Sequence, residues 1–180
     1  MILFLRFIGV MNAAVWFGSA VFILAAAPVF FSTHVQSTPL GKFWPGVMVQ
    51  FLFERFFYIQ CVCATIAIAH QLAEWVYLGR ALQRWVMILL GALLVFVLAE
   101  GLWLQPKMRS LNLVKWGMND RYAAVQYPVT QRQDADASFK RWHGVSRIFG
   151  LFATIAVGTF FWKVIHPGDS PRFIPNKFRG

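Results

Sequence analysis

Charged residues are scarce in this sequence of 180 residues. Asp, Glu, Lys and Arg make up 13% of the chain and hydrophobic residues 58%, whereas an ordinary soluble domain carries about 25% charged residues. Acidic side chains are the rarest, with 7 Asp and Glu against 17 Lys and Arg, a formal net charge of +10. This composition indicates a membrane protein whose basic residues flank its spans and meet lipid headgroups rather than nucleic acid.

The motifs of common catalytic and metal sites are also missing. The sequence has no phosphate-binding loop, no zinc motif and no pattern typical of Ser/His/Asp or Cys/His catalysis. Its two cysteines, Cys61 and Cys63, lack CxxC spacing and point to different sides of a helix. We therefore predict no catalytic residues and no metal site, and we interpret both cysteines as small apolar residues in a helix interface.

Long hydrophobic runs are abundant. Four runs approach the ~20 residues that cross a hydrocarbon core, and they cover residues 7–31, 56–78, 85–104 and 142–164. Backbone hydrogen bonding inside lipid requires each run to be a helix. The predicted fold class is therefore all-α, a polytopic membrane protein in which residues 1–180 form a single domain, a bundle of four transmembrane helices with a long third loop.

An even number of spans leaves two long segments on one side of the membrane, here called the loop face. They are residues 32–55 and 105–141, and the opposite side is called the terminal face. Pro45 suits the first turn of a helix, so the second helix is expected to begin there, with its first turns in the membrane interface or outside it. The fourth helix also starts before it enters lipid, with a choice of N-caps at Asp134, Asp136 and Ser138.

Small residues recur at four-residue spacing in the first span, where Gly9 pairs with Ala13 and Ala14 with Gly18. Such positions let helices approach each other closely. The preferred interpretation is packing inside the bundle, and the alternative is a dimer.

Ionisable residues in or beside the spans are few, and most lie towards the loop face. A charge at the centre of a bilayer costs ~2.5 to 3.5 kcal/mol on insertion scales, so each charge needs a partner or an exit. Because successive spans run in opposite directions, the sequence predicts one polar cluster beneath the loop face, made of Glu54, Arg55, Glu100, His143 and Arg147. It is interpreted either as a structural pair of Glu100 with Arg147 or as an ion, lipid-headgroup or small-molecule site.

His70 and Glu74 form another i, i+4 pair, near the terminal-face end of the second span. A membrane histidine can bind the metal of haem or of a chlorophyll-type pigment axially, and it can equally hydrogen-bond a neighbouring helix. His143 differs from His70 in depth by roughly 20 Å, so the two cannot share an iron. The sequence predicts no cofactor by itself, and His70 is the candidate ligand if haem or a pigment is bound.

Four segments of the sequence resemble a known family. They are "RFIGVMNAAVWFGSAVFILAAAPVFF", "FERFFYIQ", "EGLWLQPKMRSL" and "FKRWHGVSRIFGLF". These segments are similar to an uncharacterised four-helix membrane family, a domain of unknown function, related to eukaryotic transmembrane protein 205. They are more distantly similar to bacterial copper-resistance D proteins and to the membrane-bound protoporphyrinogen oxidase family. The resemblance covers nearly the whole chain and implies a four-helix bundle.

The resemblance also implies roles for single residues. Trp16 and Gly18 would be packing positions, and the residues of a loop-face signature would be Pro106, Arg109, Phe139, His143 and Gly144. The oxidase family binds haem through a histidine in its first helix, seven residues before the matching tryptophan, where this sequence has Gly9. This departure counts against inherited haem chemistry, and the copper-resistance likeness lacks a methionine-rich or histidine-rich ligand set.

Three functions are compatible with these features. The preferred hypothesis is a non-catalytic integral membrane protein of the bacterial inner (cytoplasmic) membrane, an accessory or assembly subunit that contacts lipid and other membrane-protein subunits. Its 8 Trp and 19 Phe residues supply aromatic area for both kinds of contact. One alternative is a haem- or pigment-binding redox membrane protein. The other is a small ion or metal transporter built around Glu100 and Arg147, against which the lack of a polar stripe through the spans weighs.

Overall fold

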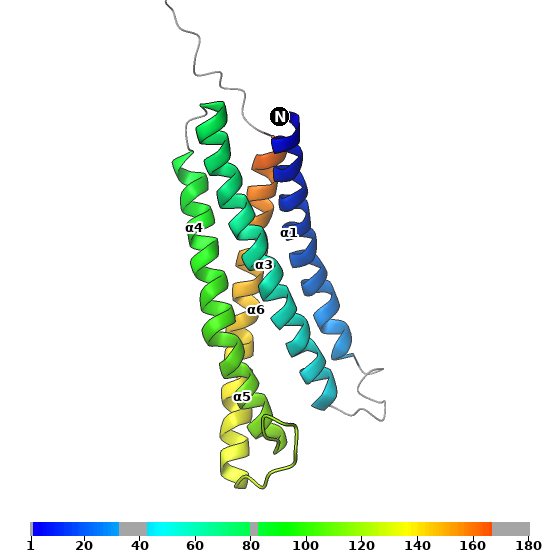
Figure 1. Ribbon diagram of the computed structural model, residues 1–180. Coiled ribbons are helices and arrows are strands. Elements are labelled where there is room, and N and C mark those ends of the chain that lie inside the picture. Colours follow the sequence, from blue (N-terminus) through cyan, green and yellow to red (C-terminus); the bar gives the residue numbers. More distant parts are fainter. Residues whose placement is uncertain (1, 33–42, 80–82, 167–180) are drawn as a thin grey trace, which may run out of the picture.

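The computed structural model describes residues 2–32, 43–79 and 83–166, and long helices make up most of these segments (Figure 1). Within them, four helical stretches are long and apolar enough to cross a membrane. They are formed by α1 (Ile2–Phe30), α3 (Phe43–Leu78), α4 (Arg84–Ala99) with its continuation η1 (Glu100–Leu104) and α5 (Gln105–Trp116), and α6 (Val129–Ile165). The predicted all-α class with four membrane-crossing helices is confirmed.

The helices form an elongated bundle in which α1 packs on α3 and α6, and α4 also packs on α3 and α6 (Figure 1). This arrangement closes a ring of four helices around one apolar core. At its centre the fully buried Trp16 ring lies 6.1 Å, edge to face, from the ring of Phe160. Ala64 and Leu90 complete the core from α3 and α4, and both are 0% exposed.

The third membrane-crossing stretch is continuous from α4 through η1 to α5. Pro106 has no N–H for the carbonyl of Leu102, and its ring would clash with that carbonyl in a regular α-helix. The preceding turn widens into the π-helix η1, in which the Gln105 N–H donates to the Glu100 carbonyl, five residues back. Helix α5 then ends at Gly117, whose φ of 67° lies in the left-handed region that favours glycine.

The long third loop is shorter and more helical than the sequence predicted. Helix α5 covers its beginning and α6 its end, so residues 117–128 make the connection. Helix α6 begins at Val129, ahead of the predicted N-caps; its N-cap residue is Pro128, whose ψ of 143° is extended. Pro45 lies in the first turn of α3, as predicted, and the helix begins two residues before it, at Phe43.

Tryptophans in contact with lysines occur at two levels of the apolar part of the bundle, and a third such pair, Lys115 with Trp116, lies further out at the end of α5. Near the loop face, Lys107 Nζ lies 4.0 Å from the ring centre of Trp142 and 5.0 Å from that of Trp103. Near the terminal face, Lys163 Nζ lies 5.7 Å from the ring centre of Trp85. From Trp85 to Trp103 the helix rises about 27 Å, close to the ~30 Å of a hydrocarbon core. Because Trp and Lys favour membrane interfaces, we take these levels as the terminal-face and loop-face boundaries of the bilayer.

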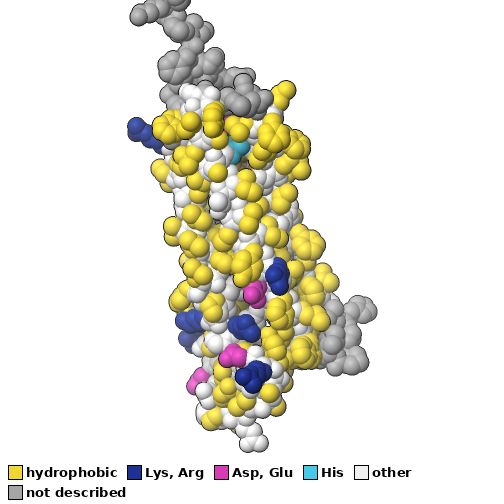
Figure 2. Space-filling model, in the orientation of Figure 1, with side chains coloured by type: hydrophobic (Ala, Val, Ile, Leu, Met, Phe, Trp, Pro, Cys, Tyr) yellow, Lys and Arg dark blue, Asp and Glu magenta, His cyan; other side chains and the backbone are white. Residues whose placement is uncertain are grey.

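Beyond the loop-face boundary the chain forms a small layer with its own core, here called the loop-face layer. It comprises the first turns of α3, α5, residues 117–128 and the first turns of α6. Phe43 and Val47 of α3 pack there on Leu113 of α5, and the rings of Trp116 and Tyr122 lie 6.2 and 6.3 Å from that of Phe43. Charged side chains gather towards this end, whereas the middle of the visible face is mostly hydrophobic (Figure 2).

Candidate intramembrane polar site

Glu100 lies on the side of the third membrane-crossing stretch that faces the bundle. The buried residues of α4 recur every three or four positions, and they are Val86, Leu90, Leu93 and Val97. The same spacing continues through Glu100 to the buried Leu104. The half-buried Glu100 carboxyl therefore points towards the interior, about one turn inside the loop-face boundary at Trp103. A carboxyl inside the membrane is a candidate functional group.

The π-helix changes the backbone beside this carboxyl. Gly101 approaches α3 so closely that a Cβ there would lie 2.1 Å from the ring of Phe57. The Gln105 N–H is bonded to the Glu100 carbonyl, and Pro106 has no N–H, so the Gly101 carbonyl lacks the helical donors at i+4 and i+5. π-turns of this kind occur frequently at functional sites.

Gln60 brings another polar group to the same depth. It lies on the interior stripe of α3 that continues through Cys63, Ala64 and Ala67, and it is 4% exposed. Gln60 is three residues from Phe57, which touches Gly101, so it lies within about one helical turn of Glu100 in depth.

The remaining members of the predicted cluster lie near the same end of the bundle but face different ways. Glu54 and Arg55 are exposed on α3. His143 is half-buried on α6, where its ring stacks on that of Phe139 with 5.8 Å between ring centres. Arg147, one turn deeper on α6, is exposed. The structure therefore places Glu100 in the interior and Arg147 on the outer surface.

The predicted ion pair of Glu100 with Arg147 is not formed, since Glu100 faces the bundle interior and Arg147 is exposed. Ion pairing within the described segments occurs instead in the loop-face layer, where Asp136 accepts from Lys115 of α5 and from Lys140, each at 2.7 Å. Asp136 precedes Trp142 on α6 and so lies outside the lipid. Hydrogen bonds from both ammonium groups hold the pKa of Asp136 below its usual range.

His70 is buried near the terminal face, where it joins α3 to α1. Its Nε2 lies 2.9 Å from the carbonyl oxygen of Leu5 and so donates to it. Gly9 makes room for the ring, since a Cβ at this position would lie 2.5 Å from Nε2. The imidazole nitrogen nearest to α1 is thus engaged in helix packing. No group of three His, Cys, Asp or Glu side chains suited to a metal ion occurs in residues 2–32, 43–79 and 83–166.

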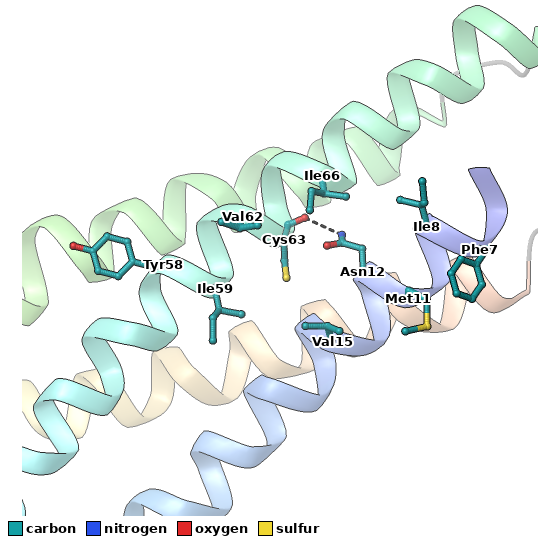
Figure 3. A pocket seen from close by; sticks show the side chains of 10 residues that line it. All are labelled: Phe7, Ile8, Met11, Asn12, Val15, Tyr58, Ile59, Val62, Cys63 and Ile66. Atoms are coloured by element: carbon teal, nitrogen blue, oxygen red, sulfur yellow. Dashed lines mark hydrogen bonds between the residues drawn. The ribbon is translucent and has the colours of Figure 1, made fainter. Parts of the chain in front are cut away.

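An open apolar groove of about 560 Å³ runs between the outer faces of α1 and α3 (Figure 3). Its lining includes Phe7, Met11, Val15, Ile59, Val62 and Ile66. Asn12 reaches across it from α1, and its Nδ2 donates to the Cys63 carbonyl at 2.9 Å (Figure 3). The amide therefore ties α1 to α3, and the exposed surface of the groove is left apolar, as lipid tails require.

Two contributors to the site were not predicted from the sequence. Gln60 was missed although it shares an interior stripe with Cys63 and Ala64, which is a periodicity that the sequence displays. Gly101 was missed because its role depends on the π-turn, for which Pro106 is the only local signal. Asn12 was also passed over, although an amide inside a membrane helix calls for a partner on a neighbouring helix.

Comparison with known families agrees with the membrane architecture. A family model described as a domain of unknown function (DUF4149) matches residues 11–115. The match covers more than half of the chain, which therefore belongs to this family. The matched segment contains Gln60 and Glu100 and ends within α5, before α6 begins. No curated protein and no solved structure matches the chain.

Proposed function

We propose that the chain is a non-catalytic accessory or assembly subunit of a larger membrane complex. The observation that carries this proposal is an apolar stripe on the part of α3 that belongs to the loop-face layer. Trp44, Met48 and Phe51 share one side of the helix through their i, i+4, i+7 spacing, and they are 42%, 43% and 50% exposed.

Most of this stripe lies beyond the reach of lipid tails. Phe57 packs on Gly101, and a Cβ at Gly46 would lie 3.4 Å from the Asn112 side chain of the antiparallel α5. By this register Arg55 is at about the level of Trp103. Trp44 is 11 residues further out along α3, a rise of about 16 Å, whereas the headgroup region adds roughly 5 to 8 Å on each side.

An apolar stripe at this height suits the surface of another protein. Contiguous exposed apolar area on a protein marks interaction sites, and aromatic residues and Met are enriched in the buried centres of interfaces. The stripe is contiguous with the core of the loop-face layer, since Trp44 lies 5.3 Å from Phe43 and 6.2 Å from Tyr122 between ring centres. A partner subunit bound here would extend that core.

The proposal includes the setting of the subunit. Residues 1–180 would form one membrane domain of the bacterial inner membrane, surrounded by lipid between the two boundaries and by other subunits at the loop-face layer. A relation to transmembrane protein 205, to copper-resistance D proteins or to the protoporphyrinogen oxidase family stays a prediction. The packing of His70 against Gly9 argues against the redox alternative.

Purification from native membranes in a mild detergent tests the proposal. We expect the chain to elute with a fixed set of partners on size exclusion, and the double variant Trp44→Gln/Met48→Gln to elute without them. The matched control is Val129→Gln, which changes another apolar residue of the layer that is 69% exposed. A wild-type chain that elutes alone, or a double variant that keeps its partners, would contradict the proposal. Visible absorption that follows the isolated chain would favour the redox alternative instead.

A further inference from the structure

We propose that the groove between α1 and α3 binds one acyl chain of a phospholipid from the loop-face leaflet, with the phosphate of the headgroup on Arg55 and Tyr58. The site lies deeper in the membrane than the proposed docking stripe of α3 and does not depend on it. Three features carry the proposal: the depth of the groove, the cation at its outer end and the hydroxyl beside that cation.

The groove reaches from the headgroup level into the middle of the membrane. Tyr58 lines one end of this space of about 560 Å³ and Phe7 the other (Figure 3). Tyr58 lies one turn inside the loop-face boundary, which is the level of Arg55, and Ile66 of the lining lies about 16 Å below Arg55. The hydrocarbon core is ~30 Å thick, so the α3 side of the groove spans about one leaflet.

The walls of the groove suit an acyl chain but do not select one lipid from another. Val15 of α1 and Val62 of α3 are 52% and 57% exposed, and the amide of Asn12 is engaged with the Cys63 carbonyl. Inside a membrane, contact between such side chains and a lipid tail contributes dispersion rather than a hydrophobic gain. Selectivity must therefore come from the headgroup.

Arg55 places a cation at the loop-face end of the groove. Arg55, Ile59 and Val62 share one side of α3 through their i, i+4, i+7 spacing, and Arg55 is exposed. Among the described residues, no carboxylate lies within ion-pair distance of it. A guanidinium stays charged and presents paired donors that match a phosphate. A headgroup phosphate at this level would supply the partner that Arg55 lacks.

Tyr58 adds a hydroxyl on the same side of α3. Side chains of a helix lean towards its N-terminus, which for α3 is the loop-face end, so the hydroxyl reaches back towards the level of Arg55. The residue is 54% exposed, and its hydroxyl points away from the rest of the lining (Figure 3). Both groups can therefore meet one phosphate.

The other end of the groove has no matching cation on α1. Arg6 directly precedes Phe7, but it lies about 140° around the helix from Met11 and about 180° from Val15, which line the groove. The charge therefore favours a lipid of the loop-face leaflet.

The first test is the thermal stability of the purified full chain in detergent, followed by tryptophan fluorescence. We expect the Tm to rise and saturate with dioleoylphosphatidylglycerol. It should change much less with dioleoylglycerol, which has the same chains but no phosphate, or with inorganic phosphate, which has no chains. An equal rise with dioleoylglycerol would show chain packing without headgroup recognition, and a rise with phosphate alone would show an anion site without a lipid. Either result, or no rise at all, would overturn the proposal.

Two variants with matched controls locate the site. Arg55→Gln should lose most of the rise, whereas Arg141→Gln, which removes another exposed arginine near the same boundary, should keep it. Val62→Trp should fill the groove and weaken the effect, and Val95→Trp, at a position of α4 that is 68% exposed, should not. Because all four positions are exposed, the variants should fold. Equal responses of variants and controls would contradict the site.

The second test needs no variant. A phosphatidylglycerol with a photoactivatable group in one acyl chain labels its neighbours in native membranes, and peptide mass spectrometry locates the products. We expect labels on Met11, Val15 and Val62 that unlabelled phosphatidylglycerol suppresses. Labels spread evenly over the four membrane-crossing helices, or a groove protected by another protein, would overturn the proposal. The first test uses the isolated chain, so its outcome is separate from the loss of partners tested above.

Discussion

Replacing Gly9 by Ala would put a methyl group where the His70 ring now meets α1. The Cβ would lie 2.5 Å from Nε2 and 2.6 Å from Cε1 of that ring, well inside the ~3.5 to 4.0 Å of ordinary contact between heavy atoms. The ring must therefore move away from α1. Its 2.9 Å hydrogen bond to the Leu5 carbonyl would be lost with this movement.

The expected loss of stability follows from two opposing contributions. When the hydrogen bond is lost, a buried donor left without an acceptor costs about 1 to 3 kcal/mol. Alanine offsets part of this loss because it is a better helix former than glycine, by about 1 kcal/mol in water. We therefore expect Gly9→Ala to lower the free energy of unfolding by about 1 kcal/mol, and by up to about 2 kcal/mol.

The assay is reversible unfolding in mixed micelles, with Gly18→Ala as the matched control on the same helix. No atom lies within 4 Å of the Cβ position at Gly18, so this variant should be neutral or slightly more stable. In a His70→Ala background the clash is removed, and Gly9→Ala should then also be neutral or stabilising. Equal destabilisation by Gly9→Ala in both backgrounds would refute the packing argument, as would a variant as stable as Gly18→Ala.

Two further predictions concern η1 and the loop-face layer. Gly101→Ala should destabilise the fold and Gly91→Ala should not, because a Cβ at Gly101 would lie 2.1 Å from the Phe57 ring and nothing lies within 4 Å at Gly91; equal Tm values for the two variants would contradict this. The pKa of Asp136 is lowered in the folded state by its lysine partners, so its ion pairs stabilise the layer above the unfolded pKa of about 3.9 and are lost as pH falls through the lower folded value. Hydrogen exchange, corrected for intrinsic rates, should therefore quicken in α5 at acidic pH in the wild type, and Asp136→Asn should show the quicker exchange already at pH ~7, which is above both pKa values.

The four membrane-crossing helices could be predicted because lipid leaves the backbone no alternative to a helix. The ends of the helices outside the lipid could not be predicted in this way. Beyond the boundaries, water competes for every backbone group, so local signals decide. Helix α6 begins directly after Pro128, ahead of the predicted caps, and the packing of Phe43 on Leu113 holds the first turns of α3 as helix.

For the residues of the predicted polar cluster, depth in the membrane could be predicted from the sequence, whereas the direction of each side chain could be predicted only in part. Depth follows from counting residues along antiparallel helices, so the shared level of Glu100, His143 and Arg147 was foreseeable. Direction depends on which side of each helix meets its neighbours. The interior side of α4 follows from the spacing of its buried residues, which points Glu100 inwards. In α6 the apolar residues surround much of the helix, so the sequence did not reveal that Arg147 faces outwards.

The π-helix connects the interior site to the loop-face layer. A π-turn holds one more residue than an α-turn, and one residue corresponds to a rotation of about 100° around the helix axis. Without η1, α5 would present a different side to α3, and Leu113 would no longer meet Phe43 and Val47. The shape of the layer therefore depends on the turn that also frees the Gly101 carbonyl.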